Sequence, residues 1–557
     1  MDPAEKKEVP VETQEAQAGE EGQAISKKAL KKAEKEAAKL AKKAEKAQAN
    51  PQKSQQDEED PLQANYGDIP LIQSQDQTDR KWVSVGSVND SFVGQEILLR
   101  ARLHSSRVKG KIGFLVLREK FNDLQAVISE TEGQVSRKML KWVSGLSKES
   151  IVDVYGEVKK PEQEILSCSQ KVELHIKRIY CVSRSHATLP FQIDDASRPI
   201  QKGEVEMENY DNVEKPKEEE EKKDDQQSTV GLKTRLDNRV IDLRTKANQA
   251  IMRVQSGVCQ LFREFLYEHG FIEIHTPKLI SGTSEGGANV FKLKYFDREG
   301  CLAQSPQLYK QMCIMADFDR VFEVGPVFRA ENSFTHRHMC EFTGLDIEMA
   351  IKENYYEIFD LMGELFAHIF EGLEKRFAKE LETINHQFPF DPFKFKRPVV
   401  KLTFQEGIDL LKENGVEWPP MEDLDTTTER KLGELVKKKY DTDFYILHRY
   451  PVTARPFYTM LCKDDPRYTN SYDFFMRGEE ITSGAQRIHD PELLAKRAEE
   501  CGIKVDTIKD YIESFKYGAY PHGGVGIGLE RVVMLYCALG NIRKSTLFPR
   551  DPRRITP

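Results

Sequence analysis

Two strand-like runs, residues 320–330 and 338–349, flank the short polar segment 331–337, and this arrangement constrains the fold more than any other stretch of the chain. The first run is rich in Val and Phe, which suit a pleated, half-buried surface. We therefore predict an antiparallel hairpin whose loop is too long for a two-residue turn. Charged or titratable side chains stand where the core of an ordinary hairpin would require apolar ones. They are Arg329, Glu331, Arg337, His338, Glu341 and Asp346.

This polar content admits two interpretations. Charged residues on one face of a strand are usually solvated, which would favour an ordinary surface hairpin. Here both signs of charge mix with the aromatic residues Phe328 and Phe342, which is typical of a small polar pocket that binds an anion. The segment FRAENSFTHRHMCEFTGLDIEM at 328–349 resembles motif 2 of the class II (subclass IIb) aminoacyl-tRNA synthetases, and among them the aspartyl enzymes of the eukaryotic cytosol.

A glycine-rich run, GGVGIGLER at 523–531, precedes an apolar helical pattern at 532–539. A dinucleotide-binding interpretation fails, because no βαβ unit lies behind the run and the G-x-G-x-x-G spacing is not met. The pattern GxGxGLER instead resembles motif 3 of the same enzymes. The resemblance implies that Arg531 lies over the adenine of ATP with Phe342 on the opposite face, contacts worth about 1 to 2 kcal/mol each.

Helical periodicity begins at Thr245 and continues to Gly270, a residue suited to end a helix. A short strand is predicted at 271–274. This segment resembles motif 1, the homodimer interface of class II enzymes, and the resemblance places Pro277 at the contact between subunits.

The three motifs together imply a reaction and a set of site residues. Aspartate would attack the α-phosphorus of ATP to give aspartyl-adenylate and pyrophosphate, and the aspartyl group would then pass to the 3′-hydroxyl of tRNA(Asp). The catalytic residues implied are Arg329 and Arg531. The ATP-binding residues implied are Arg329, Glu331, Arg337, His338, Met339, Phe342, Glu480, Gly528, Leu529, Glu530 and Arg531. The aspartate-binding residues implied are Glu285, Gln307, Lys310, Arg329, Asp346, Ser483 and Arg487.

The chemistry explains why such residues are needed. Two anions must meet, so neutralising charge and aligning the reactants are the main tasks. Arg329 would serve the α-phosphate, and loss of one preorganised donor typically costs about 3 to 4 kcal/mol of barrier. Mg²⁺ prefers oxygen ligands and substrate phosphates. Glu480 and Ser483, in RGEEITSGAQR, match the family's metal-binding positions, and residues 284–287 would form a closing loop.

The acidic side chain of aspartate calls for fixed cations. Lys310 and Arg487 are the candidates, and an arginine can hold both oxygens of a carboxylate. The asparaginyl enzymes are the closest alternative, but QSPQLYKQ and SGAQRIHD resemble the aspartyl sequences. A lysyl enzyme would carry acidic groups at these two positions. A silent tRNA-binding paralogue would be expected to lack Arg329, Glu480 or Arg531, and all three are present.

Short strands are predicted at 81–88, 96–104, 113–118, 124–128, 151–158 and 171–181, with a helical piece near 133–146. Their spacing indicates a small Greek-key barrel of the OB type. Such barrels stack single-stranded bases on aromatic side chains. The region resembles the anticodon-binding barrel of subclass IIb. The resemblance implies that Phe114, Gln125 and Glu173 bind the anticodon, whereas the pattern alone favours Phe114 as a core residue.

Upstream of the barrel, residues 26–48 form a lysine-striped helical pattern with a weak apolar face. A solvated tail and an electrostatic arm for tRNA phosphates are both compatible with it. The SKKALKK run is similar to the arm of eukaryotic aspartyl enzymes, which assigns Lys27, Lys28, Lys31 and Lys32 to tRNA. Farther along, residues 204–225 hold eleven acidic residues against four Lys, and we predict a disordered insertion there.

The expected fold class is α+β, with an OB-type barrel before a class II catalytic domain built on an antiparallel sheet flanked by helices. The expected regions are a helical arm and linker at 1–79, the barrel at 80–190, a hinge with the acidic insertion at 191–240 and the catalytic domain at 241–557. A charged content of 31% without a long apolar run excludes a membrane span. The absence of a recognisable targeting segment and the nine scattered Cys favour the cytoplasm. The sequence leaves open whether the chain joins a multi-synthetase assembly.

Overall fold

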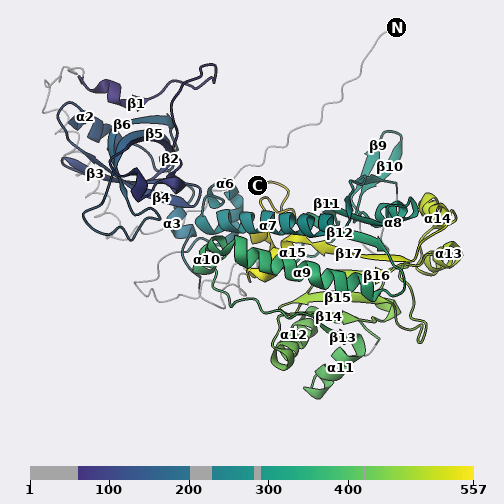
Figure 1. Cartoon of the computed structure of the whole chain (residues 1–557). Coiled ribbons are helices and arrows are strands. Elements are labelled where there is room, and N and C mark those ends of the chain that lie inside the picture. The colour runs from purple at the N-terminus through teal and green to yellow at the C-terminus, as the bar shows by residue number, and fades with distance from the viewer. Residues whose placement is uncertain (1–59, 201–228, 282–289, 420) are drawn as a thin grey trace, which may run out of the picture. The chain divides into compact units, whose positions relative to one another are not determined.

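A closed sheet forms the first folded region of the computed structural model, which describes residues 60–200, 229–281, 290–419 and 421–557 (Figure 1). Within these residues six strands pair in the order β1-β6-β4-β3-β2-β5, and β5 also pairs with β6, which closes the barrel. The strands are β1 Tyr66–Asp68, β2 Glu96–Lys109, β3 Ile112–Glu119, β4 Asn122–Ser129, β5 Ile151–Lys159 and β6 Glu173–Ser183, with helix α2 Arg137–Ser144 between β4 and β5. The predicted OB-type barrel is confirmed.

The predicted first strand of this barrel, at residues 81–88, is wrong. Residues 81–88 contribute only the isolated bridge from Trp82 to Leu98 and the 3-10 turn η2 Val85–Ser87. The hydroxyl of Ser87 donates to the carbonyl oxygen of Ser84, a local bond that competes with strand pairing. The sheet instead gains β1, which lies within the predicted linker and pairs in parallel with β6.

The second folded region contains a larger sheet. Among the described residues its strand order is β13-β14-β15-β16-β17-β12-β11-β7, antiparallel except for the pairs β13–β14 and β11–β7. The strands are β7 Ile272–Glu273, β11 Arg320–Phe328, β12 Glu341–Ala350, β13 Val400–Thr403, β14 Phe444–His448, β15 Ser471–Met476, β16 Glu479–Gln486 and β17 His522–Gly528. A smaller sheet holds β8 Leu279–Ile280, β10 Arg298–Leu302 and β9 Lys292–Tyr295. The predicted hairpin is confirmed as β11 and β12.

Helices α7, α9, α11 and α12 lie along this sheet (Figure 1). The helices that follow the barrel in the described residues are α3 Ile193–Ala196, α5 Leu232–Asp237, α6 Arg239–Asp242, α7 Lys246–Glu268, α8 Gln307–Met315, α9 Tyr356–Arg376, α10 Ala378–Gln387, α11 Phe404–Glu413, α12 Thr426–Tyr440, α13 Pro491–Glu500, α14 Lys509–Phe515 and α15 Leu529–Tyr536. The 3-10 turns besides η2 are η1 Gln63–Asn65, η3 Asp90–Phe92, η4 Val452–Ala454, η5 Val505–Ile508 and η6 Ile542–Ser545. As predicted, a helix, α7, follows Thr245 and ends before Gly270, whose φ of +77° suits a glycine. The Thr245 side chain caps this helix by accepting from Asn248 N.

Alternation along the strands divides the buried residues between the two faces of the sheet. On β14, Phe444 and Ile446 join the core formed with α7, α9 and α15, whereas Tyr445 and Leu447 pack with α11 and α12. Successive side chains of a strand point to opposite faces, so alternate residues of the other strands also lie on opposite faces of the sheet. Among the helices of the described residues, none has the length and apolar character needed to cross a bilayer.

Candidate active site

A cavity of about 240 Å³ lies over β12, β16 and β17, beside the loop that follows β11. On β12, Leu345, Ile347 and Met349 belong to the core under α7 and α9. Asp346 and Glu348 alternate with them and therefore lie on the opposite face of the sheet. The cavity is thus built on the face that these helices leave open.

Most of the residues predicted from the sequence line this cavity. From the ATP set they are Arg329, Glu331, Arg337, His338, Met339, Phe342, Glu480, Gly528, Glu530 and Arg531, and from the aspartate set Gln307, Arg329, Asp346, Ser483 and Arg487. Leu529 and Lys310 do not line it. Leu529 is the first residue of α15 and packs in the core. Glu285 lies outside the described residues.

The glycines of β17 make room for the carboxylates of β12. Asp346 pairs across the ladder with Gly526, and Glu348 pairs with Gly524. A Cβ atom at Gly524 would lie 2.3 Å from Glu348 Oε2, and one at Gly526 would lie 3.2 Å from Asp346 Oδ1. The glycine-rich run therefore allows two carboxylates to pack against a neighbouring strand and keeps the cavity open.

Two buried cations neutralise these carboxylates. Lys310 Nζ lies 3.1 Å from Asp346 Oδ1 and 3.4 Å from Glu348 Oε2, and it also donates to the carbonyl oxygens of Ile347 and Val525. Arg487 donates to both carboxylate oxygens of Glu348. Although burial alone would raise it, the pKa of Glu348 is held below its ordinary value by Arg487 and Lys310. The four groups form a neutral, fixed network at one end of the cavity.

Arg329, Arg337 and Arg531 line the cavity together with the ring of Phe342. The guanidinium of Arg329 lies 5.5 Å from the ring centre of Phe342. Arg531 donates to the carbonyl oxygens of Glu480 at 3.0 Å and Arg337 at 3.4 Å. Burial, together with the nearby arginines, lowers the pKa of His338 to about 4, so this imidazole is neutral near pH 7. Such a ring can hydrogen-bond to a polyanion but adds no charge.

The sequence analysis missed three residues. Arg455 lines the cavity, and Asp473 and Glu429 each contact an arginine that lines it. Arg455 donates to Ser483 Oγ and to Asp473 Oδ2, and its guanidinium stacks over the ring of Tyr450. The third residue, Glu429, accepts a bond from Arg337. Asp473 stands alone as a carboxylate in the aromatic strand SYDFFM, which was an available signal. Arg455 and Glu429 had no such signal, because both come from segments far from the motifs.

Oxygen ligands suited to Mg²⁺ lie in the cavity and next to it, since Glu480 and Ser483 line it and Asp473 neighbours Ser483 on the adjacent strand. Asp473 pairs with Ser483 across the ladder, its Oδ1 is buried and has no hydrogen-bond partner among the described residues, and burial and Glu480 raise its pKa to about 7. A dication would relieve both conditions. No group of three or more His, Cys, Asp or Glu in the described ranges could hold a metal ion. Mg²⁺ usually takes one or two carboxylates, with water and phosphates completing its shell, so Glu480 and Asp473 fit it.

The predicted anticodon residues share one face of the barrel. Phe114 is 46% exposed, which contradicts the interpretation as a core residue. Val116, two residues along β3, pairs with Gln125, and Gln125 pairs with Glu173 on β6. Gln125 Nε2 donates to Glu173 Oε1 at 2.6 Å. The structure therefore brings the three side chains to one surface as a ring and two adjacent polar groups.

Other predicted residues lie elsewhere. Pro277 is exposed between β7 and β8, near the exposed side chains of Ile272 and Leu279. The four lysines assigned to the tRNA arm, Lys27, Lys28, Lys31 and Lys32, and the acidic insertion lie outside the described residues.

Comparison with known proteins adds an independent finding. A family model described as class II tRNA synthetases (D, K and N) matches residues 231–552, and one described as an OB-fold nucleic acid binding domain matches residues 97–182. Aspartate–tRNA ligase 1, cytoplasmic, of Arabidopsis thaliana is 51% identical over 538 residues, which are 96% of this chain and 98% of that protein. The cytoplasmic aspartate–tRNA ligase of Homo sapiens is 52% identical over 500 residues, 90% of this chain and 96% of that protein. The solved aspartyl-tRNA synthetase of Entamoeba histolytica has a TM-score of 0.78 and 47% identity, and the match covers 88% of this chain and 96% of that one.

Proposed function

The chain belongs to the class II tRNA synthetases of the aspartate, lysine and asparagine group, and from this premise we propose how its cavity carries out the reaction. The chain acts as an aspartate–tRNA ligase: ATP activates aspartate, and the aspartyl group then passes to tRNA. One observation supports the proposal most strongly. Among the described residues, five arginines line a single cavity, namely Arg329, Arg337, Arg455, Arg487 and Arg531. A site that brings an amino acid carboxylate to a triphosphate needs this concentration of cations.

The arginines and Phe342 form the part of the cavity that binds ATP. Arg531 and Phe342 hold the adenine between them, a guanidinium and a ring on opposite faces. Arg329, beside Phe342, takes the α-phosphate and stabilises the charge that develops there during attack. Arg337 and the neutral His338 take the outer phosphates. Glu331, Met339, Gly528 and Glu530 also line the cavity and complete the nucleotide site.

The aspartate end uses the buried ionic network. Arg487 takes the side-chain carboxylate of the substrate, and Asp346 takes its α-amino group. Gln307 lies beside Asp346 in the cavity lining. Lys310 contributes by holding Asp346 and Glu348, because its ammonium already donates to protein oxygens. Asparagine carries a neutral amide in place of the side-chain carboxylate. Binding of asparagine would leave Arg487 without an anionic substrate group, so the site discriminates against it.

Glu480, Ser483 and Asp473 are the residues that would hold Mg²⁺, which would offset the charge of the triphosphate and polarise a phosphoryl oxygen. Arg455 fixes the ligands on the protein side, because its two ends donate to Ser483 and Asp473. For Glu285, which lies outside the described residues, the proposed role is a contact to the substrate and rests on the sequence resemblance alone.

Transfer to tRNA requires recognition far from this chemistry. Phe114 stacks on an anticodon base, and Gln125 and Glu173 read base edges. The arm with Lys27, Lys28, Lys31 and Lys32 adds attraction to phosphates that does not depend on sequence. The acceptor is the 3′-hydroxyl of the terminal ribose, and substrate oxygens rather than a protein side chain receive its proton.

The chain works as a homodimer in the cytoplasm. The support for dimerisation is the exposure of three apolar residues, Ile272, Pro277 and Leu279, of which Ile272 lies on the edge strand β7. Exposed sheet edges are commonly covered by a partner. The cytoplasmic location rests on the names of the relatives, and membership of a multi-synthetase assembly is a question for co-purification.

ATP–pyrophosphate exchange tests the activation step directly. The purified chain is offered ATP and Mg²⁺ with aspartate, asparagine or lysine in separate reactions. We expect exchange with aspartate only. Exchange that proceeds equally well with asparagine would contradict the assignment of Arg487, and exchange absent with all three would contradict the whole site.

A further inference from the structure

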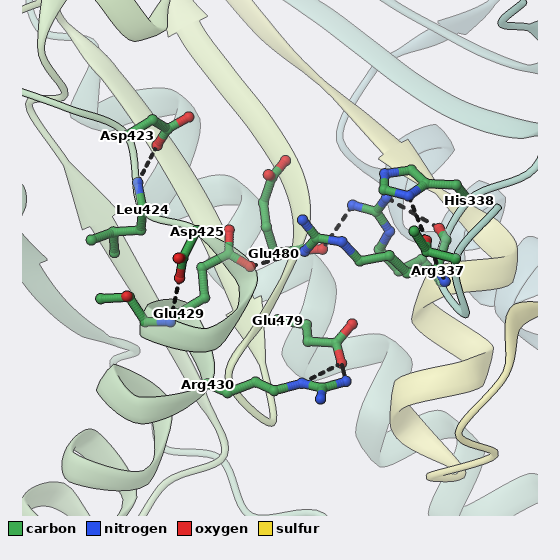
Figure 2. Close-up of polar contacts among 12 residues, drawn as sticks. Arg337, His338, Asp423, Leu424, Asp425, Glu429, Arg430, Glu479 and Glu480 are labelled. Atoms are coloured by element: carbon green, nitrogen blue, oxygen red, sulfur yellow. Dashed lines mark hydrogen bonds and ion pairs between the residues drawn. The ribbon is translucent and has the colours of Figure 1, made fainter. Parts of the chain in front are cut away.

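The first turn of α12 contacts the loop between β11 and β12, although the two segments are about ninety residues apart in the sequence. Arg337 Nη1 in this loop lies 2.9 Å from Glu429 Oε2 on α12. Both side chains are nearly buried, with exposures of 17% and 8%. Figure 2 shows Arg337 extending from its loop to reach Glu429. None of the three sequence motifs includes this helix.

The backbone of the loop is held from a different direction. Three successive carbonyl oxygens accept hydrogen bonds: that of Thr335 from Arg543 Nη1 at 2.9 Å, that of His336 from Ile542 N at 2.8 Å and that of Arg337 from Arg531 Nη2 at 3.4 Å. These bonds fix where the Arg337 side chain begins. They leave the direction of its long, flexible stem to be set by a contact at the guanidinium.

The α12 turn is itself firmly placed. The carboxylate of Asp425 caps the helix by accepting from Thr428 N at 2.7 Å, and Glu429 N donates to the carbonyl oxygen of Asp425. The next residue, Arg430, donates to Glu479 Oε1 (Figure 2). Its Nη2 also lies 3.0 Å from His336 Nε2. Two consecutive helix residues therefore hold two consecutive side chains of the loop.

The contact with Glu429 engages the Nη1 end of the guanidinium, and Arg337 also lines the cavity. A guanidinium is planar, so fixing one end fixes the plane in which its remaining N–H donors point. We propose that Glu429 is a positioning residue that holds the Arg337 guanidinium in the orientation in which it meets the outer phosphates of ATP. This inference rests on the proposed role of Arg337 in nucleotide binding.

A double-mutant cycle in ATP–pyrophosphate exchange tests the inference. The variants are Glu429→Ala, Arg337→Ala and the double variant, with Glu429→Gln as an isosteric change that keeps a hydrogen-bond acceptor. For Glu429→Ala we expect the KM for ATP to rise about tenfold while kcat stays within about threefold, because positioning affects binding of the triphosphate. For Glu429→Gln we expect a rise of about threefold. The double variant should match Arg337→Ala within about twofold, because Glu429 acts through that arginine.

Two controls separate this role from a general effect on the fold. Glu434→Ala removes an exposed carboxylate from the same helix and should leave both constants unchanged. The KM for aspartate should also stay constant in Glu429→Ala. If Glu429→Ala does not fold, the KM for ATP of Glu429→Gln tests the positioning role instead. The thermal unfolding midpoint of Glu429→Gln is measured to show that this variant is folded.

Three outcomes overturn the inference in distinguishable ways. An unchanged KM for ATP in a folded Glu429 variant removes the positioning role. Additive effects in the double variant show that Glu429 acts without Arg337. A parent enzyme without aspartate-dependent exchange overturns the proposed function first, and the positioning role falls with it.

Discussion

Arg487 donates from Nε and Nη2 to the two carboxylate oxygens of Glu348, at 3.0 and 3.2 Å, and both side chains are buried. The same arginine lines the cavity, so one guanidinium serves both the protein interior and the substrate site. An arginine held at one edge by a carboxylate has little freedom at its other edge. In the proposed site, selection of an acidic substrate would therefore depend on a carboxylate that the substrate does not need to touch.

Replacement of Arg487 by Leu should abolish aspartate-dependent exchange while ATP binding survives. The substitution also leaves the buried Glu348 with Lys310 as its remaining cationic partner among the described residues, and breaking a buried ion pair typically costs about 3 to 5 kcal/mol of stability. We therefore expect Arg487→Leu/Glu348→Leu to recover stability and remain inactive with aspartate. Nucleotide binding is measured by titration with ATP, and unfolding by urea. Arg467→Leu, which changes an exposed arginine, is the control. Equal exchange rates in Arg487→Leu and its parent would refute the role.

Replacement of Lys310 by Met should reduce stability more than any change at a surface lysine. Its ammonium is 2% exposed and compensates both Asp346 and Glu348. Removing one member of a buried ionic network costs about 3 to 5 kcal/mol. Urea unfolding measures the loss, and Lys516→Met, which changes an exposed lysine, should leave the midpoint unchanged. A loss below about 1 kcal/mol would show that the carboxylates find other partners.

The sequence was most informative where a periodic pattern or a dense motif was present. The hairpin of β11 and β12, the helix α7 and the barrel were all predictable from alternation, helical spacing and short strands. The role of Lys310 was not predictable. The spacing of residues indicates which helix or strand carries a lysine, but it does not indicate whether the ammonium contacts the substrate or a neighbouring carboxylate. The positions of Glu429 and Arg455 near the cavity were not predictable either. Both residues are distant in sequence from the motifs, and only the folded chain brings them to Arg337 and Asp473.

Acid should destabilise the fold through its buried histidines. His522 is fully buried, and its Nδ1 lies 2.7 Å from the carbonyl oxygen of Tyr520 while its Nε2 lies 2.9 Å from Gln311 Nε2. Burial lowers the pKa of His522 to about 4. Below pH 6.5 the unfolded chain therefore binds a proton that the folded chain excludes, and stability falls as pH drops from 6.5 to 4. A shift of this size corresponds to about 3 kcal/mol.

The variant His522→Gln isolates this contribution. Its free energy of unfolding should fall by about 3 kcal/mol less than that of the parent between pH 7 and pH 4. His448, whose pKa burial also lowers to about 4, maintains part of the remaining slope. Urea unfolding at several pH values provides the measurement, with the exposed His386→Gln as control. Parallel pH profiles for parent and His522→Gln would contradict the assignment.

Replacement of Phe114 by Ala should weaken tRNA binding without affecting aspartate activation. A half-exposed ring that stacks on a base contributes about 1 to 3 kcal/mol. The KM for tRNA in aminoacylation should rise accordingly, whereas ATP–pyrophosphate exchange without tRNA should match that of the parent. Leu166→Ala removes a more exposed apolar side chain of the same region and serves as control. If both variants weaken tRNA binding equally, the effect belongs to general surface contact rather than stacking.

Removal of residues 1–50 should lower tRNA affinity at low salt and spare adenylate formation. The prediction rests on the lysine stripe of the sequence, because this segment lies outside the described residues. Each phosphate contact releases counterions, so the loss should shrink as salt rises and the slope of log affinity against log salt should become shallower. A full-length variant with Lys27, Lys28, Lys31 and Lys32 changed to Arg keeps the charge and should bind as the parent does. Their change to Ala should reproduce most of the deletion. Affinity unchanged across the salt titration would leave the arm without this role, and a loss independent of salt would assign it to packing instead of phosphate attraction.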